Sequence, residues 1–134
     1  IFKEFFNKTL DNNNLESRNE DTYLNISKRE NYLFNSSIHG IEDSDFIFLI
    51  GTNPRYEATM VNARIRKTFL KNNVKVFSLN DVGDLTYPYK SLNGKIEKIK
   101  EIIEDNNEIS TLIKNAKKPI VIFGQSLLKS KSAK

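Results

Sequence analysis

The 134-residue sequence contains no cysteine, no tryptophan and only one histidine, His39. Without cysteine the chain has no disulfide bond, no thiolate-bound zinc ion and no cysteine-held iron–sulfur cluster of its own. One histidine also excludes a metal site built from several imidazole ligands. His39 stands in a predicted turn with Gly40, where a surface or packing role is favoured over catalysis. The residue types therefore predict no metal site in this chain.

Long hydrophobic runs are absent as well. No apolar run reaches the roughly 18–20 residues that a membrane-spanning helix requires, so we expect no direct membrane span. Hydrophobic residues make up 38% of the chain and gather in short, dense runs such as Phe46–Ile50 and Ile120–Phe123. Such runs are typical of strands buried on both faces and argue against disorder.

Positive charge exceeds negative charge only modestly, with a formal net charge of +4. The cations are spread along the chain, and their only short cluster is Arg64, Arg66 and Lys67. A nucleic-acid-binding module usually combines a basic patch with a recognisable motif, and neither is present. We therefore expect no nucleic-acid partner.

Three segments predict strands of one parallel sheet: Phe46–Ile50, Val74–Leu79 and Ile120–Phe123. The first and last stop at a glycine, Gly51 and Gly124 respectively. Uninterrupted apolar strands of this kind belong to parallel sheets that helices cover on both faces. The fold class predicted is therefore α/β, with a Rossmann-like parallel sheet.

A helix is predicted between the first two strands, from Ala58 to Lys71, because Val61, Ile65 and Phe69 form an apolar stripe at helical spacing. Strand, helix and strand together have the length of a right-handed crossover. Further helices are expected at Ile1–Leu10, Lys95–Glu104, Glu108–Ala116 and Gln125–Leu128. The stretches Glu16–Asn31 and Asn80–Gly94 predict a polar loop and an irregular connection. We divide the chain into an amino-terminal helix with its polar loop (1–30) and an α/β segment (31–134).

The loop from Gly51 to Arg55 stands where open α/β sheets bind ligands, beyond the carboxyl end of a strand. A turn that needs glycine and proline for its shape also explains the loop, and we favour that interpretation over a ligand site. The Gly-x-Gly-x-x-Gly pattern of dinucleotide-binding loops is absent. No serine stands in a nucleophile elbow, and the carboxylate pairs Asp43/Asp45 and Glu104/Asp105 lie in polar stretches. The residues thus predict an α/β segment without a visible active site.

One long string carries a resemblance. The residues from Gly51 to Lys67 read GTNPRYEATMVNARIRK and closely resemble the GTNPR(Y/F)EAP–x–x–NARIRK segment of the largest iron–sulfur subunit of respiratory complex I. The segments Asn31–Ile38, Asp84–Tyr87 (DLTY) and Ala116–Pro119 agree in order and spacing, so the resemblance extends from about Asn31 to Leu128. The family usually has proline where this chain has Thr59, whose hydroxyl can cap a helix instead.

The resemblance implies a region similar to molybdopterin-dependent oxidoreductases that has lost the metal cofactor and serves a structural role. It implies no catalytic, cofactor-binding or metal residue and no cofactor in this chain, with iron–sulfur clusters and flavin located elsewhere in the complex. The signature residues are expected to be structural, with Glu57 as the nearest partner of Arg55. These residues are Gly51, Asn53, Pro54, Arg55, Glu57, Asn62, Arg64 and Arg66.

The expected function is to support electron transfer from NADH to ubiquinone without catalysing it. Expected partners are the remainder of the same subunit and other peripheral-arm subunits, and we expect both ends of the chain to be cut from a longer polypeptide. The implied location is the matrix side of the mitochondrial inner membrane, or its bacterial cytoplasmic equivalent. The alternative is a cofactor-binding fragment of a molybdopterin-dependent oxidoreductase such as a formate dehydrogenase. The residues Asn62–Lys67 favour complex I, and the missing glycine pattern disfavours a free-standing nucleotide-binding module.

Overall fold

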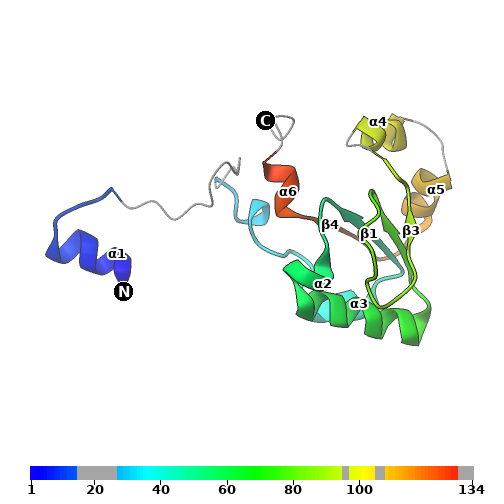
Figure 1. Ribbon diagram of the computed structural model, residues 1–134, viewed down its shortest axis with the longest axis horizontal. Helices are drawn as coiled ribbons and strands as arrows, with labels where there is room; N and C mark the ends of the chain where they lie inside the picture. Colours follow the sequence, from blue (N-terminus) through cyan, green and yellow to red (C-terminus); the bar gives the residue numbers. More distant parts are fainter. Residues whose placement is uncertain (15–26, 95–96, 105–107, 130–134) are drawn as a thin grey trace.

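The computed structural model describes residues 1–14, 27–94, 97–104 and 108–129. Its centre is a four-stranded, entirely parallel sheet in the order β3-β2-β1-β4 (Figure 1). The strands are β1 (Phe46–Ile50), β2 (Lys75–Ser78), β3 (Lys90–Ser91) and β4 (Pro119–Phe123). The prediction of three parallel strands is confirmed, with β2 one residue shorter at each end than the predicted Val74–Leu79.

The central strand β1 is buried along its whole length and divides the core into two layers. Ile47 and Leu49 face one cluster, to which helix α3 (Thr59–Asn72) contributes Ile65. Phe46, Phe48 and Ile50 face the other, beside α4 (Glu97–Glu104), α5 (Glu108–Asn115) and α6 (Gln125–Leu128). Figure 1 shows α3 on one side of the sheet and these three helices on the other. The predicted helices on both faces are confirmed.

The crossover helix follows the predicted stripe closely. Ile65 is fully buried, and Val61 and Phe69 pack against the same cluster. The sequence did not predict the short helix α2 (Pro54–Glu57) before it. The non-helical backbone of Ala58, with φ at −150° and ψ at 67°, separates α2 from α3. Proline at the first helical position after an asparagine is nevertheless a readable start signal for α2.

The segment Asn80–Gly94 was expected to be irregular, and the two-residue strand β3 inside it is a correction. Lys90 and Ser91 pair in parallel with Phe77 and Ser78 of β2. The strand was missed because it is short and polar, so neither an apolar run nor alternation marks it.

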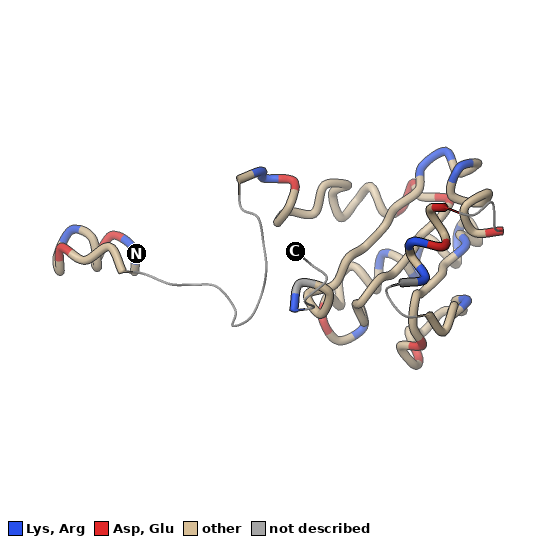
Figure 2. Tube along the Cα trace, turned by 90° about the horizontal axis from the view of Figure 1, so that it is seen from above, with Lys and Arg blue, Asp and Glu red and all other residues tan. Residues whose placement is uncertain are grey.

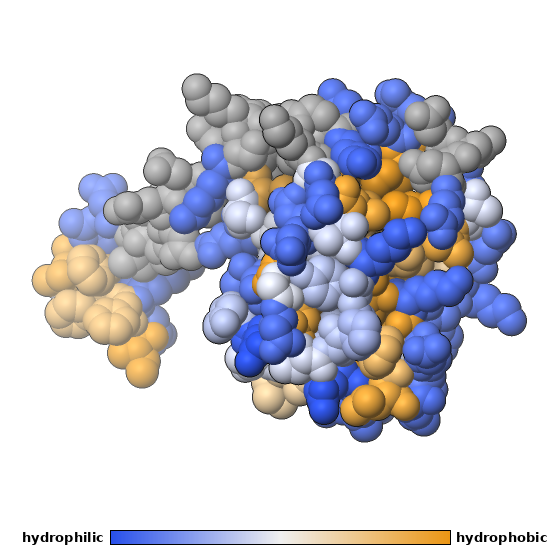
Figure 3. Space-filling model, turned by 45° about the vertical axis from the view of Figure 1, so that its right-hand side comes forward, coloured by the Kyte–Doolittle hydropathy of each residue, from blue (hydrophilic) through white to orange (hydrophobic). Residues whose placement is uncertain are grey.

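The helix predicted at Ile1–Leu10 is present from Phe2 to Thr9, as a first turn α1 (Phe2–Glu4) that continues into a π-helical stretch η1 (Phe5–Thr9). Its apolar side chains remain exposed, including Ile1, Phe2, Phe5 and Leu10. Figure 3 shows this group of apolar residues at the left-hand end of the molecule. Most of the predicted loop Glu16–Asn31 lies outside the described residues, apart from a short 3-10 turn, η2 (Arg29–Asn31). The division at residue 30 stays a prediction.

Charges of both signs are interspersed over the body of the protein (Figure 2). None of the helices in the described ranges is both long and apolar enough to cross a membrane.

Candidate functional site

The loop that leaves β1 meets the loop that leaves β4 at the carboxyl edge of the sheet. In the sheet order β1 and β4 are neighbours, and the chain leaves β1 toward α3 on one face and leaves β4 toward α6 on the other. Open α/β sheets bind ligands at such a point. A Cβ atom on Gly124 would lie 1.9 Å from the carbonyl oxygen of Gly51, so the two backbones are in direct contact. The Ser126 hydroxyl donates a hydrogen bond to that same carbonyl. The chain itself therefore fills the crevice between β1 and β4.

Gly51 adopts the left-handed backbone region, with φ at +61°. A side chain there would be strained and would also meet Leu127 and Ser126 at 2.7–2.8 Å. The glycine predicted to shape the turn thus has two physical reasons for its identity, the backbone angle and the close approach of α6.

The polar groups of the loop bond to the chain itself. Asn53 caps α2 by accepting from the backbone N–H of Arg55 at 3.1 Å, and its Nδ2 donates to the carbonyl of Val82 at 2.8 Å. The two carboxylate oxygens of Glu57 accept from the Asn53 backbone N–H and from the Thr52 hydroxyl, both at 3.0 Å. These bonds fix the shape of the loop and engage the groups that a ligand would otherwise contact.

Arg55 does not pair with Glu57, and that prediction was wrong. Its Nη1 donates instead to Asp84, to the carboxylate at 2.6 Å and to the backbone carbonyl at 2.8 Å. Glu57 is turned toward Thr52 and Asn53, whereas Asp84 comes near only through the fold. The backbone N–H of Thr86 and then the Arg55 guanidinium lower the pKa of Asp84. Since both side chains of the pair are exposed to solvent, water and salt screen it and it contributes little to stability.

Asn62 links α3 to the same segment as Arg55 does, but inside the core. Its Nδ2 donates to the carbonyl of Leu85 at 3.1 Å, and its Oδ1 accepts from the Tyr87 hydroxyl at 2.8 Å. Burial raises the pKa of Tyr87, which keeps the phenol protonated as the donor. Arg66, one turn further along α3, donates to the carbonyl of Thr86. Arg55, Asn62 and Arg66 therefore all hold the Asp84–Tyr87 segment.

Arg64 points to a different partner. With Lys67 it binds Glu42, whose side chain is only 12% exposed and which belongs to the 3-10 turn η3 (His39–Asp43). Hydrogen bonds from Lys67 and then from Arg64 lower the pKa of Glu42 to about 2. The sequence marked Arg64 as a signature residue but gave no signal for Glu42, which lies 22 positions away.

Thr59 does not cap α3. The helix has Ala58 at its N-cap position and no side-chain capping bond, and Thr59 is its first helical residue. The position that proline usually occupies in the resembled family is therefore within the first helical turn, where proline also fits.

A pocket of about 420 Å³ adjoins the loop, with Phe34, Thr52, Glu57, Val61 and Gln125 in its lining. A molybdopterin group carries phosphate, and among the described residues the only charged side chain lining this pocket is the carboxylate of Glu57. Both oxygens of that carboxylate are already bonded, and no described buried side chain has a nitrogen or oxygen without a partner. Within the described ranges, no three His, Asp or Glu residues gather as a metal site would require. The residues present do not fit a pterin cofactor.

Comparison with known proteins agrees with this architecture. All of residues 1–134 match the family described as molybdopterin oxidoreductase. The chain belongs to that family. The chain is 38% identical over 122 residues to the potato (Solanum tuberosum) protein named NADH dehydrogenase [ubiquinone] iron-sulfur protein 1, mitochondrial.

Two further proteins are similar over most of the chain. The NADH-ubiquinone oxidoreductase 75 kDa subunit of Reclinomonas americana is 38% identical over 84% of it. The mitochondrial 78 kDa subunit of Candida albicans is 37% identical over 78% of it. The potato match covers 91% of this chain but 16% of the potato protein, and the other two cover 16% and 14% of their relatives. The predicted resemblance to the large iron–sulfur subunit of complex I is confirmed.

Proposed function

We propose that this chain is a structural segment of the largest iron–sulfur subunit of complex I. It supports electron transfer from NADH to ubiquinone by holding the fold of that subunit, and it binds no cofactor itself. The observation that carries this proposal is the closed crevice at the carboxyl edge of the sheet, where Gly124 and Ser126 contact Gly51. The assignment to complex I is supported by the names of the relatives, which are NADH–ubiquinone oxidoreductase subunits.

The signature residues support a structural role because their bonds stay within the chain. Arg55, Asn62 and Arg66 bind the Asp84–Tyr87 segment, and Asn53 binds Val82. Together they fasten α2 with its N-cap, and the crossover helix α3, to the long connection that follows β2. Hydrogen bonds of this kind, made within the chain, shape and hold the domain.

The partners in this proposal are the remainder of the same subunit and its neighbours in the peripheral arm. The location is the matrix side of the mitochondrial inner membrane. Two of the relatives carry "mitochondrial" in their names, which supports the compartment.

Elemental analysis of the purified full-length subunit tests the absence of a cofactor. We expect molybdenum and tungsten well below one atom per chain, and no pterin fluorescence after acid extraction. One equivalent of either metal, released together with a pterin, would instead establish the alternative, a cofactor-binding molybdopterin enzyme. A known formate dehydrogenase treated in parallel is the positive control.

A further inference from the structure

Among the described residues, no strand pairs with the outer edge of β4, so the main-chain groups on that edge are open. The backbone N–H of Gly124 donates to the carbonyl of Ile50, so Gly124, Ile122 and Ile120 face β1 through their main-chain groups. Because these groups alternate in direction along a strand, those of Pro119, Val121 and Phe123 face away from β1. Proline has no N–H to leave unpaired, and it is tolerated at such an outward edge position. The edge thus offers two outward donors, the amides of Val121 and Phe123.

The side chains of β4 on one face of the sheet are also left uncovered. Val121 and Phe123 pair in register with Phe48 and Ile50, so all four lie on the α4–α5 face of the sheet. Phe48 and Ile50 are 3% and 2% exposed, whereas Val121 and Phe123 are 41% and 66% exposed. The helices therefore cover this face over β1 but leave it open over β4.

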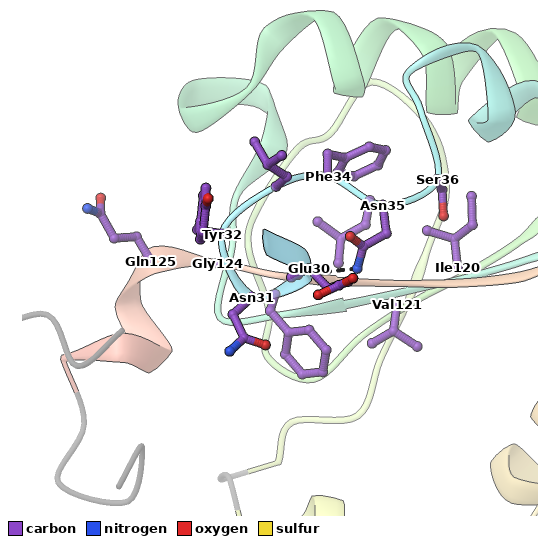
Figure 4. Close-up of a pocket in the computed structure, with 13 residues that line it drawn as sticks. Glu30, Asn31, Tyr32, Phe34, Asn35, Ser36, Ile120, Val121, Gly124 and Gln125 are labelled. Atoms are coloured by element: carbon purple, nitrogen blue, oxygen red, sulfur yellow. Dashed lines mark hydrogen bonds between the residues drawn. The ribbon is translucent and has the colours of Figure 1, made fainter. Parts of the chain in front are cut away.

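A groove runs beside the open edge. It has a volume of about 430 Å³ and lies between β4 and the segment Glu30–Ser36 (Figure 4). Residues of β4 line one wall, and the segment Glu30–Ser36, which includes the apolar Leu33 and Phe34, lines the other. A strand edge beside an apolar wall is the arrangement that binds an added extended strand.

We propose that this groove receives a fifth parallel strand from the remainder of the same polypeptide, with apolar side chains turned toward Val121 and Phe123. The inference rests on the proposed function and deepens it. Helix α6 begins directly after β4, and a helix that follows a parallel strand normally returns the chain to a neighbouring parallel strand. One side of β4 is taken by β1, so the neighbouring place is the groove. The relatives are long enough to supply the strand, since this chain covers only 16% of the potato protein.

Hydrogen exchange in the full-length subunit, resolved to single amides, tests this. We expect the Val121 and Phe123 amides to be as well protected as the Ile122 amide, which already bonds to β1 and serves as the internal standard. The variant Val121→Pro removes one outward donor and should lower the yield of folded subunit at least threefold. The control variant is Leu70→Lys, at a side chain on α3 that is 68% exposed. Proline is not used at this position because it would break α3. Leu70→Lys should leave the yield unchanged.

Three results would overturn the inference. Protection that appears only in the assembled complex would assign the strand to another subunit. Protection that depends on protein concentration would assign it to a second copy of this chain. Rapid exchange of both amides under every condition would mean that no strand binds. If the subunit contains no molybdenum and the Val121 and Phe123 amides are unprotected, this inference alone is refuted. If the subunit contains stoichiometric molybdenum and these amides are protected, only the proposed function is refuted.

Discussion

Tyr87 donates its phenolic hydrogen to Oδ1 of Asn62 across 2.8 Å inside the core. The same asparagine donates to the carbonyl of Leu85. One side chain on the crossover helix therefore satisfies two buried groups of a segment more than 20 residues further along the chain. This arrangement joins the two most distinctive strings of the sequence, NARIRK and DLTY, into one structural unit.

Loss of either partner should loosen that unit. In Asn62→Leu the Leu85 carbonyl and the Tyr87 hydroxyl both lose their partner, and in Tyr87→Phe the side-chain Oδ1 of Asn62 loses its donor. Each variant should lower the free energy of opening of the Leu85–Tyr87 amides by about 1–3 kcal/mol, measured by native-state hydrogen exchange. The matched control is Tyr56→Phe at a 78% exposed tyrosine, which should change stability by less than about 0.5 kcal/mol. Equal effects at both tyrosines would contradict the assignment.

The contact between Gly51 and Gly124 predicts a contrast between two glycines. Gly124→Ala places a methyl group against backbone atoms at 1.9 Å, which cannot be relieved by a side-chain rotation. Gly83 has a φ of +74° but open space around it, so Gly83→Ala should cost only the backbone strain, about 1–2 kcal/mol. We expect Gly124→Ala to cost about 3 kcal/mol or more. Chemical denaturation of the two variants measures the difference, and a smaller loss for Gly124→Ala would show that the strand ends are not in contact.

The pKa of Glu42 predicts a dependence of stability on pH. Its folded pKa of about 2 lies below the ordinary value of 4.5, because Lys67 and Arg64 stabilise the carboxylate. Its contribution is therefore present above about pH 4.5 and is lost as the pH falls toward 2. Denaturation followed from pH 6 down to about pH 2 should show a smaller loss in Glu42→Gln than in the parent protein. Lys67→Met, which removes the first partner, should reduce the loss as well. An unchanged pH profile in both variants would argue that the ion pairs do not form in solution.

Much of the fold could be predicted because its signals are local. The apolar runs Phe46–Ile50 and Ile120–Phe123 predict strands by composition, and the Val61–Ile65–Phe69 stripe predicts the crossover helix. The expectation that both strands are buried holds only for Phe46–Ile50, because Val121 and Phe123 of β4 are exposed. The two-residue strand β3 could not be predicted, since its position depends on β2 and not on its own residues. Local signals thus predicted the three apolar strands and the crossover helix, but not the polar edge strand β3.

The site illustrates the same limit. Proximity in the sequence suggested Glu57 as the partner of Arg55, but the fold brings Asp84 to that guanidinium. The separation of 29 residues means that only the tertiary structure could decide between the two carboxylates. Likewise the contact of Ser126 with Gly51 joins the ends of two strands that are adjacent only in the sheet. The glycines themselves were visible in the sequence, and their mutual contact was not.

The chain should depend on its partners for stability. Its β4 edge is open, and apolar side chains such as Phe2, Phe5 and Phe123 are exposed, which favours aggregation. Residues 1–134 produced alone should therefore be poorly soluble or only marginally folded. Differential scanning calorimetry of the isolated monomer measures this. A sharp, cooperative transition above about 55 °C, as in self-sufficient mesophilic domains, would mean that the segment stands alone.

The central claim is that this segment supports the subunit and takes no part in the chemistry. The most direct test replaces Asn62 by leucine in the full-length subunit and measures two quantities: the amount of assembled complex and the NADH:ubiquinone reductase activity per assembled complex. The account predicts that the amount falls while the activity of each assembled complex stays at the parent level. Unchanged assembly with a loss of activity per complex would contradict it and would assign these residues a part in the reaction.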